Sequence, residues 1–158
     1  MIGRRRFGSR RGSAMVEFAL SSLVLIPAFT GTFQFGYSLY LYNELVSAVR
    51  AGARYASLEG LSNAGDGTTP SGYTTPIKQM VVYGDPTASS GTPVVPGLAA
   101  SAVSVSVTFD SGNTPSAVTV GISSYSIDAI FKTFTFTGKP SFTTPYFGKY
   151  CSSGTACP

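Results

Sequence analysis

The side chain that most needs a chemical partner in this sequence is the carboxylate of Glu17. Phe18 follows it directly, and the 26 residues between Glu17 and Glu44 carry no charge. A carboxylate at the edge of an apolar helix is costly in a membrane unless it reaches water or finds a positive partner, so Glu17 is a candidate functional residue. The simpler alternative is that Glu17 only marks where the apolar segment begins.

Catalytic chemistry has little basis in the sequence. The chain has no histidine, so neither a Ser-His-Asp nor a Cys-His arrangement is available. The aspartates are scattered, and nearly all stand beside turn-forming residues, where aspartate is expected on local grounds. Two thiols are too few ligands for a four-coordinate zinc site. We therefore expect no enzymatic activity, no metal and no cofactor.

The element that positions Glu17 is the long apolar run that follows it. A run of about 18 or more apolar residues predicts a transmembrane helix, because about 20 residues rising ~1.5 Å each cross the hydrocarbon. Gln34 is the most polar residue inside the run, and the nearby hydroxyls are expected to bond back to the helix. Pro27 is tolerated in such a helix but is expected to remove one backbone hydrogen bond and to kink it.

Two motifs carry a family resemblance. In the first, an arginine-rich leader precedes Gly12 and Ser13, Glu17 is the fifth residue after Gly12, and Phe18 follows. This spacing resembles the processing site of type IV prepilins, and the aromatic residue after the glutamate is most similar to the Tad/Flp branch. The second motif resembles TadE-like pseudopilins, and its matching residues are Phe35, Gly36, Tyr37, Arg50, Gly52, Ala53, Arg54, Tyr55 and Ala56.

This resemblance covers residues 10–57 and implies a minor pseudopilin of a Tad/Flp-type pilus. A prepilin peptidase would cleave after Gly12, and Glu17 would compensate the α-amine of Ser13 on its own chain or on a neighbour. Pro27 and the residues of the second motif would take part in helix packing. The implied partners are the peptidase, other pilins or pseudopilins, pilus assembly proteins and membrane lipid. The implied location is the bacterial inner membrane, and then the cell surface or the pilus.

The positive charge of the chain is concentrated before the junction. Five arginines precede Gly12, whereas from Ser13 onward six Lys and Arg stand against seven Asp and Glu. A nearly neutral mature chain disfavours nucleic acid binding, which needs a clustered basic face on the folded part. Basic residues beside a membrane helix stay cytoplasmic, so the C-terminal part is expected to face outward. A phosphate-binding arm is the alternative use of the arginines.

An ordinary secretory signal and an uncleaved anchor compete with this interpretation. The apolar core of a secretory signal has only about 7–15 residues and ends at an A-x-A-like site. The run here is longer, and the matching spacing at Ala51 and Ala53 lies well past it. The uncleaved anchor stays open, as a single-pass membrane protein whose exported sheet domain binds an envelope partner or a glycan.

The helix is predicted to continue past Glu44 to about Glu59. Arg50 and Arg54 share a face of it, which is either solvated near lipid headgroups or in contact with acidic groups of a neighbouring subunit. The small residues around Gly52 permit close approach of another element, either the chain's own sheet, which is favoured, or a second helix. Apolar residues recur at helical spacing through this part: Leu41, Leu45, Ala48, Val49, Ala53 and Ala56.

The C-terminal part is predicted to be rich in strands. Val and Phe alternate with Ser and Thr over residues 103–109, and apolar residues alternate with Thr119 and Gly121 over 118–122. With a turn between the two runs, a hairpin is predicted. Phe134 and Phe136 predict a third strand, and residues 125–131 a short helical connection. Residues 61–75 are predicted as a loop, and residues 77–83 as a strand or a further helical turn.

Together these elements predict an α+β, pilin-like fold, with a long N-terminal membrane helix extending into a small antiparallel sheet domain that packs on it. The predicted divisions are a cleavable basic leader at 1–12, a membrane and assembly helix at 13–60 and an exported β-rich domain at 61–158. Most aromatic residues of the last third are expected in the core or on a sheet face. Cys151 and Cys157 predict one disulfide in an oxidising compartment.

Overall fold

The computed structural model describes residues 10–62, 69–128 and 133–151, with only the backbone of Arg10 and Arg11. Contacts divide the chain into two compact units, Met1–Ser38 and Leu39–Pro158. Helix α1, Arg10–Leu58, contributes residues to both units. The predicted helix and its end near Glu59 are therefore confirmed.

In the first unit, α1 is helical over all of its described residues and continues through Pro27. Two hydroxyls near Gln34 bond back to the helix as predicted. Thr32 Oγ1 donates to the carbonyl oxygen of Ala28 at 2.9 Å, and Ser38 Oγ donates to that of Gln34 at 2.9 Å. These two bonds satisfy the hydroxyls of Thr32 and Ser38 within the helix.

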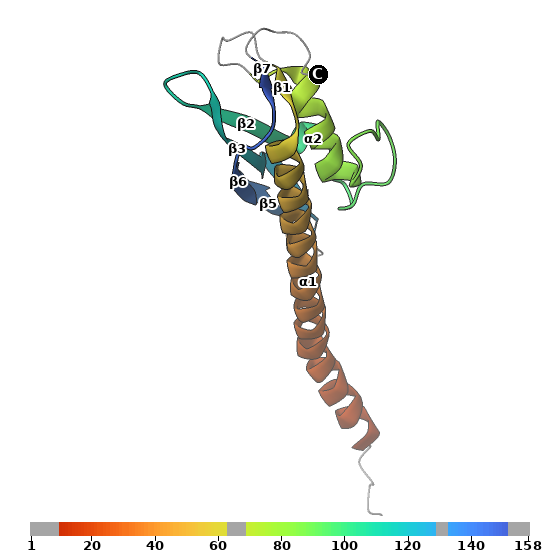
Figure 1. The fold of residues 1–158 in the computed structure, drawn as a ribbon. Helices are drawn as coiled ribbons and strands as arrows, with labels where there is room; N and C mark the ends of the chain where they lie inside the picture. The colour runs from red at the N-terminus through yellow and green to blue at the C-terminus, as the bar shows by residue number, and fades with distance from the viewer. Residues whose placement is uncertain (1–9, 63–68, 129–132, 152–158) are drawn as a thin grey trace, which may run out of the picture. The chain divides into compact units, whose positions relative to one another are not determined.

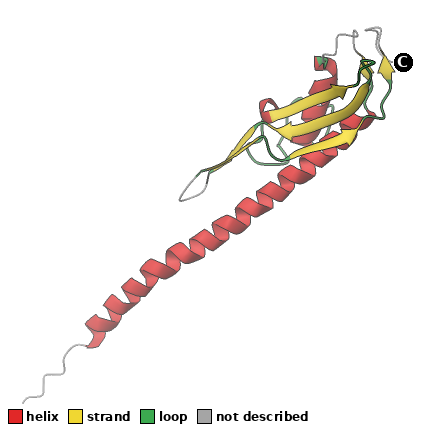
Figure 2. Ribbon diagram, turned by 90° about the vertical axis from the view of Figure 1, so that its left-hand side faces the viewer, coloured by secondary structure: helices red, strands yellow, loops and turns green. Residues whose placement is uncertain are grey.

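The second unit has two layers, a sheet and a helical layer against its inner face. The three-stranded antiparallel sheet has the order β2-β3-β6, formed by Val103–Phe109, Pro115–Ile122 and Ser141–Pro145. The helical layer consists of the C-terminal part of α1 and of α2, Ser71–Tyr83. Figure 2 shows the sheet beside this part of α1. A short 3-10 helix, Ala100–Ala102, leads into β2.

Four short strands form two further pairs. Strand β1, Leu61–Ser62, pairs in parallel with β7, Tyr150–Cys151. These two strands lie side by side, and they join the chain just after α1 to its last described residues (Figure 1). Strand β4, Ser124–Ile127, pairs antiparallel with β5, Phe134–Thr137.

The core of the second unit lies between the sheet and the two helices. All six residues that the helical spacing singled out on α1 are buried, which confirms that this face packs inward. One continuous cluster joins them to the buried side chains of α2 and β3, among them Ile77, Val81, Val118, Val120 and Ile122. Burying such aliphatic side chains stabilises a fold by about 1.5–3 kcal/mol each.

Tertiary partners define the C-terminal end of α1. The last carbonyl groups of a helix have no partner within the helix, so they need other donors. The hydroxyl of Tyr73 in α2 donates to the carbonyl oxygen of Ala56, and the N–H of Phe147 donates to that of Ser57 at 2.8 Å. The end of α1 is thereby tied both to α2 and to the segment before β7.

The hairpin predicted from alternating valines is confirmed. Val103 pairs with Ile122 and Val107 pairs with Val118, so the apolar residues of both strands share the inner face. In the turn, the N–H groups of Gly112 and Thr114 donate to Oδ1 of Asp110 at 2.9 and 3.0 Å. The hydrogen bonds from Thr114 hold the pKa of this carboxyl below its ordinary value.

The prediction of a helical connection at residues 125–131 is wrong for its described part. Tyr125 and Ile127 are buried and alternate with exposed serines in strand β4. This alternation spans only a few residues. The helical spacing of Ile127, Ile130 and Phe131 therefore led to the prediction of a helix. The strand at Phe134 and Phe136 is confirmed, but it pairs with β4 and is not a strand of the main sheet.

The third strand of the main sheet is β6, which the sequence did not predict. Only Thr144 among its residues is not exposed, so β6 has no alternation of apolar and polar residues. An edge strand with so little burial carries no hydrophobic signal. The predicted loop at 61–75 is also partly wrong, because it contains β1 and the first turns of α2. Residues 77–83 take the helical alternative.

Candidate functional site

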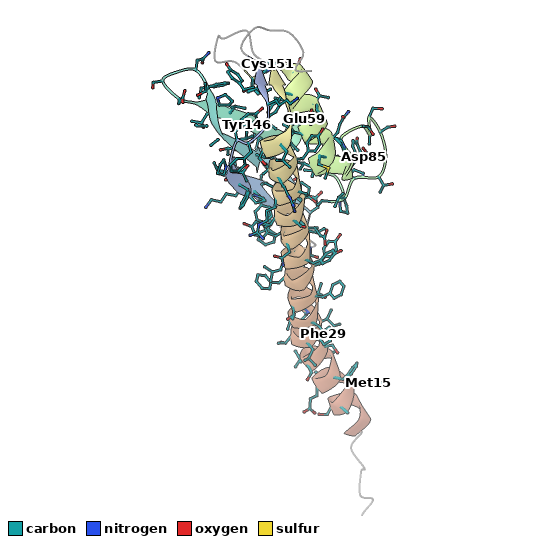
Figure 3. The ribbon with its side chains drawn as sticks, in the orientation of Figure 1. Met15, Phe29, Glu59, Asp85, Tyr146 and Cys151 are labelled. Carbon is teal, nitrogen blue, oxygen red and sulfur yellow. The ribbon has the colours of Figure 1, made fainter. Side chains whose placement is uncertain are left out.

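The N-terminal part of α1 exposes apolar side chains around its whole circumference. Leu23, Val24, Leu25 and Ile26 are each 64–71 % exposed. Because an α-helix has about 3.6 residues per turn, these four consecutive residues point in all directions. Figure 3 shows Met15 and Phe29 on this part of the helix. A helix that is apolar all round is normally covered by lipid or by other protein.

Length and composition make α1 a candidate membrane span. Within residues 10–62, 69–128 and 133–151, the one helix long and apolar enough to cross a membrane is Gly12–Leu58. Its most apolar window has a mean hydropathy of 1.6, and none of that window is buried inside the structure. The core helix of a soluble domain would be mostly buried, so the exposure supports a membrane or pilus setting for α1.

The predicted cleavage junction and Glu17 lie close together on α1. Gly12, Ser13 and Glu17 are all exposed. Ser13 and Glu17 are four residues apart in the helix, so they share one face. Glu17 forms no ion pair or hydrogen bond with a side chain elsewhere in the part of the chain that the structure describes. Its carboxylate is thus available to a partner outside this chain or to a new terminal amine.

The predicted packing residues in the first unit are exposed. Phe18 is 73 % exposed and Phe35 67 % exposed, and Pro27 and Tyr37 are also exposed. A Cβ added at Gly36 would meet no atom within 4 Å. Packing of these residues against helices of other subunits therefore stays a prediction.

The predicted packing residues in the second unit are divided between the core and the surface. Gly52 is buried against α2, because a Cβ at this position would overlap Cγ2 of Val81. Another element does approach closely at Gly52, and it is the helix α2 and not the favoured sheet. Tyr55 is half-buried against the core, whereas Arg50 and Arg54 are exposed.

A polar pocket lies where α1 meets the connection from β5 to β6. This Arg50–Lys139 pocket has a volume of about 310 Å³, and its lining also includes Tyr42 and Phe142. The guanidinium carbon of Arg50 lies 5.8 Å from the ring centroid of Phe142, within the range of a cation–π interaction. The ring of Tyr42 packs on Phe136 at a centroid distance of 5.5 Å.

Sequence reasoning singled out Arg50 and Val49 but did not link them to Lys139 and Phe142. Lys139 and Phe142 come from a connection and a strand nearly a hundred residues along the chain from Tyr42. No spacing rule links such distant segments. Predicting strand β6 would have placed Phe142 in the sheet, but the residues of β6 show no alternation of apolar and polar side chains.

A tyrosine joins the segments that follow α1 and precede β7. The hydroxyl of Tyr146 accepts a hydrogen bond from the N–H of Leu61 at 3.0 Å. It also lies 2.9 Å from the carbonyl oxygen of Glu59 and 2.8 Å from that of Lys149. Burial raises the pKa of Tyr146, which keeps the hydroxyl protonated as a donor.

Replacing Tyr146 with phenylalanine is expected to lower the free energy of unfolding by about 1–2 kcal/mol, because carbonyl acceptors lose their hydroxyl donor. The N–H of Leu61 keeps its bond to the carbonyl oxygen of Lys149 at 2.9 Å, which limits the loss. Denaturant unfolding of the full chain in detergent measures the effect. Tyr83→Phe is the control, since the hydroxyl of Tyr83 has no partner among the described residues. Equal midpoints for both variants would contradict the role of Tyr146.

The described residues bear on the expectations for a metal site and for a disulfide. Among them, no group of three or more His, Cys, Asp or Glu side chains is placed to hold a metal. Cys151 is half-buried in β7, and Cys157 lies outside the described residues. The disulfide between them therefore stays a prediction. Most of the basic leader also lies outside the described residues.

The fold and the apolar helix define a class of protein. A long N-terminal apolar helix whose C-terminal part packs against small sheets is an α+β, pilin-like arrangement. Within this class, residues 12–54 match the family described as TadE-like protein. The matched range contains Gly12, Glu17 and most of the second motif, so the resemblance drawn from these residues is confirmed. No curated protein and no solved structure matches the chain.

Proposed function

We propose that this protein is a minor pseudopilin of a Tad/Flp-type pilus, with a structural and not a catalytic role. A prepilin peptidase cleaves it after Gly12, and the apolar helix then assembles into a pilus or into its initiating or tip complex. The match of residues 12–54 to the TadE-like family carries this proposal. The exposed apolar circumference of α1 supports it, since such a surface needs lipid or other helices to cover it.

The proposed assembly moves α1 from lipid into a bundle of helices. Lipid tails are as apolar as the side chains of α1, so this transfer gains little from the hydrophobic effect and depends on packing and on polar pairs. Glu17 supplies one such pair. A buried unpaired carboxylate is unfavourable by several kcal/mol, so Glu17 favours pairing with the α-amine of Ser13 on a neighbour or on its own chain. Pairing with a neighbour also selects one register between the two helices.

The orientation and partners follow from the same proposal. The leader arginines hold the N-terminus in the cytoplasm, and the second unit faces outward from the bacterial inner membrane. After cleavage, the protein joins other pilins or pseudopilins and the pilus assembly proteins at the cell surface. An oxidising compartment outside the membrane is where a Cys151–Cys157 disulfide would persist.

The outer face of the sheet favours a second candidate function. Its side chains in register are uncharged and mostly carry hydroxyls: Ser104, Ser106, Thr108, Thr119, Ser141 and Thr143. Oγ1 of Thr119 lies 2.8 Å from Oγ1 of Thr143, which orders two of these hydroxyls. An array of this kind suits hydrogen bonding to a glycan or an envelope protein. The alternative is therefore an uncleaved single-pass membrane protein that binds such a partner.

The N-terminal residue of the protein from native membranes distinguishes the two functions. Intact mass or terminal sequencing reports it directly. A chain that begins at Ser13 supports prepilin-type processing and the pilus role. A chain that begins at Met1 or Ile2 contradicts the pseudopilin proposal and leaves the uncleaved anchor.

Replacing Gly12 with leucine is expected to block removal of the leader, because a bulky side chain crowds the junction in the peptidase. The unprocessed chain keeps its leader, and the mass of the purified protein shows this. Gly8→Leu is the matched control, since it places the same side chain in the leader but away from the junction. Normal cleavage of the Gly12 variant would place the junction elsewhere.

A further inference from the structure

We propose that the Arg50–Lys139 pocket binds the phosphodiester headgroup of an anionic phospholipid. The pocket belongs entirely to the second unit, and its residues come from α1, from the β5–β6 connection and from β6. This inference rests on the membrane anchoring in the proposed function. It does not depend on cleavage after Gly12 or on pilus assembly.

The charge of the pocket favours an anion. Arg50 and Lys139 are both exposed, and no Asp or Glu lines the pocket. Neither cation forms an ion pair with a carboxylate in the described parts of the chain. A guanidinium group presents a planar fork of donors that matches phosphate oxygens, and an ammonium group adds a compact charge. Together they offer one phosphate a bidentate partner and a point charge.

The Arg50 side chain and the backbone at Lys139 are held in place. The guanidinium of Arg50 lies over the ring of Phe142, which leaves its N–H groups free at the edge of the stack. Lys139 follows Gly138, whose φ of 69° is in the left-handed region that glycine adopts readily. The N–H of Gly138 donates to the carbonyl oxygen of Ser123 at 3.2 Å. The carbonyl oxygen of Pro140 accepts from Ile122 at 3.0 Å, so the backbone is tied on both sides of Lys139.

The position of the pocket along α1 favours a lipid over a soluble anion. Tyr42 lines the pocket and lies next to the end of the uncharged run, which also contains Tyr37 and Tyr40. Tyrosines gather at the boundary between membrane and water. Arg50 is about 12 Å beyond Tyr42 along the helix axis, and a helical side chain leans back toward the N-terminus. The guanidinium group therefore reaches back toward the headgroup layer.

The size and the walls of the pocket fit a headgroup. Ligand pockets range from about 300 to 1,000 Å³, so the volume of about 310 Å³ suits a phosphate with its glycerol and not a whole lipid. Val46 and Val49 form an apolar wall beside the cations. Such a wall suits the first carbons of the lipid, whereas an acidic side chain of a protein partner makes no use of it.

Native mass spectrometry of the full chain in detergent, titrated with phosphatidylglycerol, tests the proposal. Arg50→Gln and Lys139→Gln are each expected to weaken lipid binding about fivefold, as is typical for one basic residue near an anionic surface. Arg50→Lys is expected to recover part of the loss, because it restores the charge without the stacked fork. Arg54→Gln is the matched control, since Arg54 is also exposed on α1 but does not line the pocket.

Three outcomes would overturn the proposal. One is an equal loss of lipid binding in Arg54→Gln, which would mean that positive charge on α1 attracts lipid without a specific site. Another is displacement of the lipid by soluble glycerol phosphate at similar concentration, which means a site for free anions. The third is unchanged lipid binding in both pocket variants together with loss of a co-purifying pilin, which means an acidic protein partner.

Anchoring is measured separately, so that the two kinds of failure are distinguishable. Carbonate extraction of cells that produce each variant tests whether the chain stays in the membrane. Release of the wild-type chain by carbonate would contradict the anchoring and with it the proposed function. An anchored chain whose lipid binding ignores Arg50 and Lys139 would contradict only the pocket.

Discussion

Replacing Glu17 with alanine is expected to abolish piliation while the chain stays in the membrane. In the proposed assembly, the substitution leaves the α-amine of Ser13 without its partner inside the helix bundle. An unpaired buried charge is unfavourable by about 3–5 kcal/mol, which corresponds to a loss of more than about a hundredfold in assembly per subunit. Membrane insertion does not need Glu17, because the apolar run that follows it is unchanged.

Electron microscopy of surface pili and carbonate extraction measure the two halves of this prediction. Glu17→Asp is the informative companion, since it keeps the charge on a side chain one carbon shorter and is expected to retain part of the assembly. Cleavage at Gly12 should be followed by mass in every variant, because an uncleaved chain would fail to assemble for another reason. Normal piliation of Glu17→Ala would refute the pairing of Glu17 with the amine.

Replacing Gly52 with alanine is expected to lower the free energy of unfolding by about 1–3 kcal/mol. Alanine normally favours a helix over glycine by about 1 kcal/mol, so a loss of stability here must come from packing. The added methyl group would overlap Cγ2 of Val81, which is fully buried at the contact between α1 and α2. The two helices would have to move apart or repack.

The same substitution at Gly36 is the matched control. A Cβ at Gly36 meets no atom within 4 Å, so Gly36→Ala is expected to leave the unfolding midpoint unchanged or slightly raised. Combining Gly52→Ala with Val81→Ala removes the overlapping group, and the double variant is expected to lose less stability than the two single losses added together. Strict additivity in denaturant unfolding would show that the overlap is not the cause.

The local pattern of the sequence determined α1 and the hairpin. The uncharged run between Glu17 and Glu44 and the helical spacing from Leu41 to Ala56 are short-range signals, and both correspond to α1. The alternating valines likewise determined β2 and β3, since a strand with one buried face repeats every two residues. The TadE-like motifs lie within α1, so the similarity of residues 12–54 to this family was also readable from these residues.

Only the tertiary structure decided which segments of the second unit contact one another. Strand β6 is an exposed edge strand, so its pairing with β3 shows in no apolar pattern. Gly52 was recognisable as a site of close approach, but its partner became clear only once residues 71–83 proved to be a helix. The pocket brings Arg50 together with Lys139 and Phe142, which are about 90 residues away along the chain. Contacts between distant segments depend on how the layers pack, and no spacing within one segment encodes them.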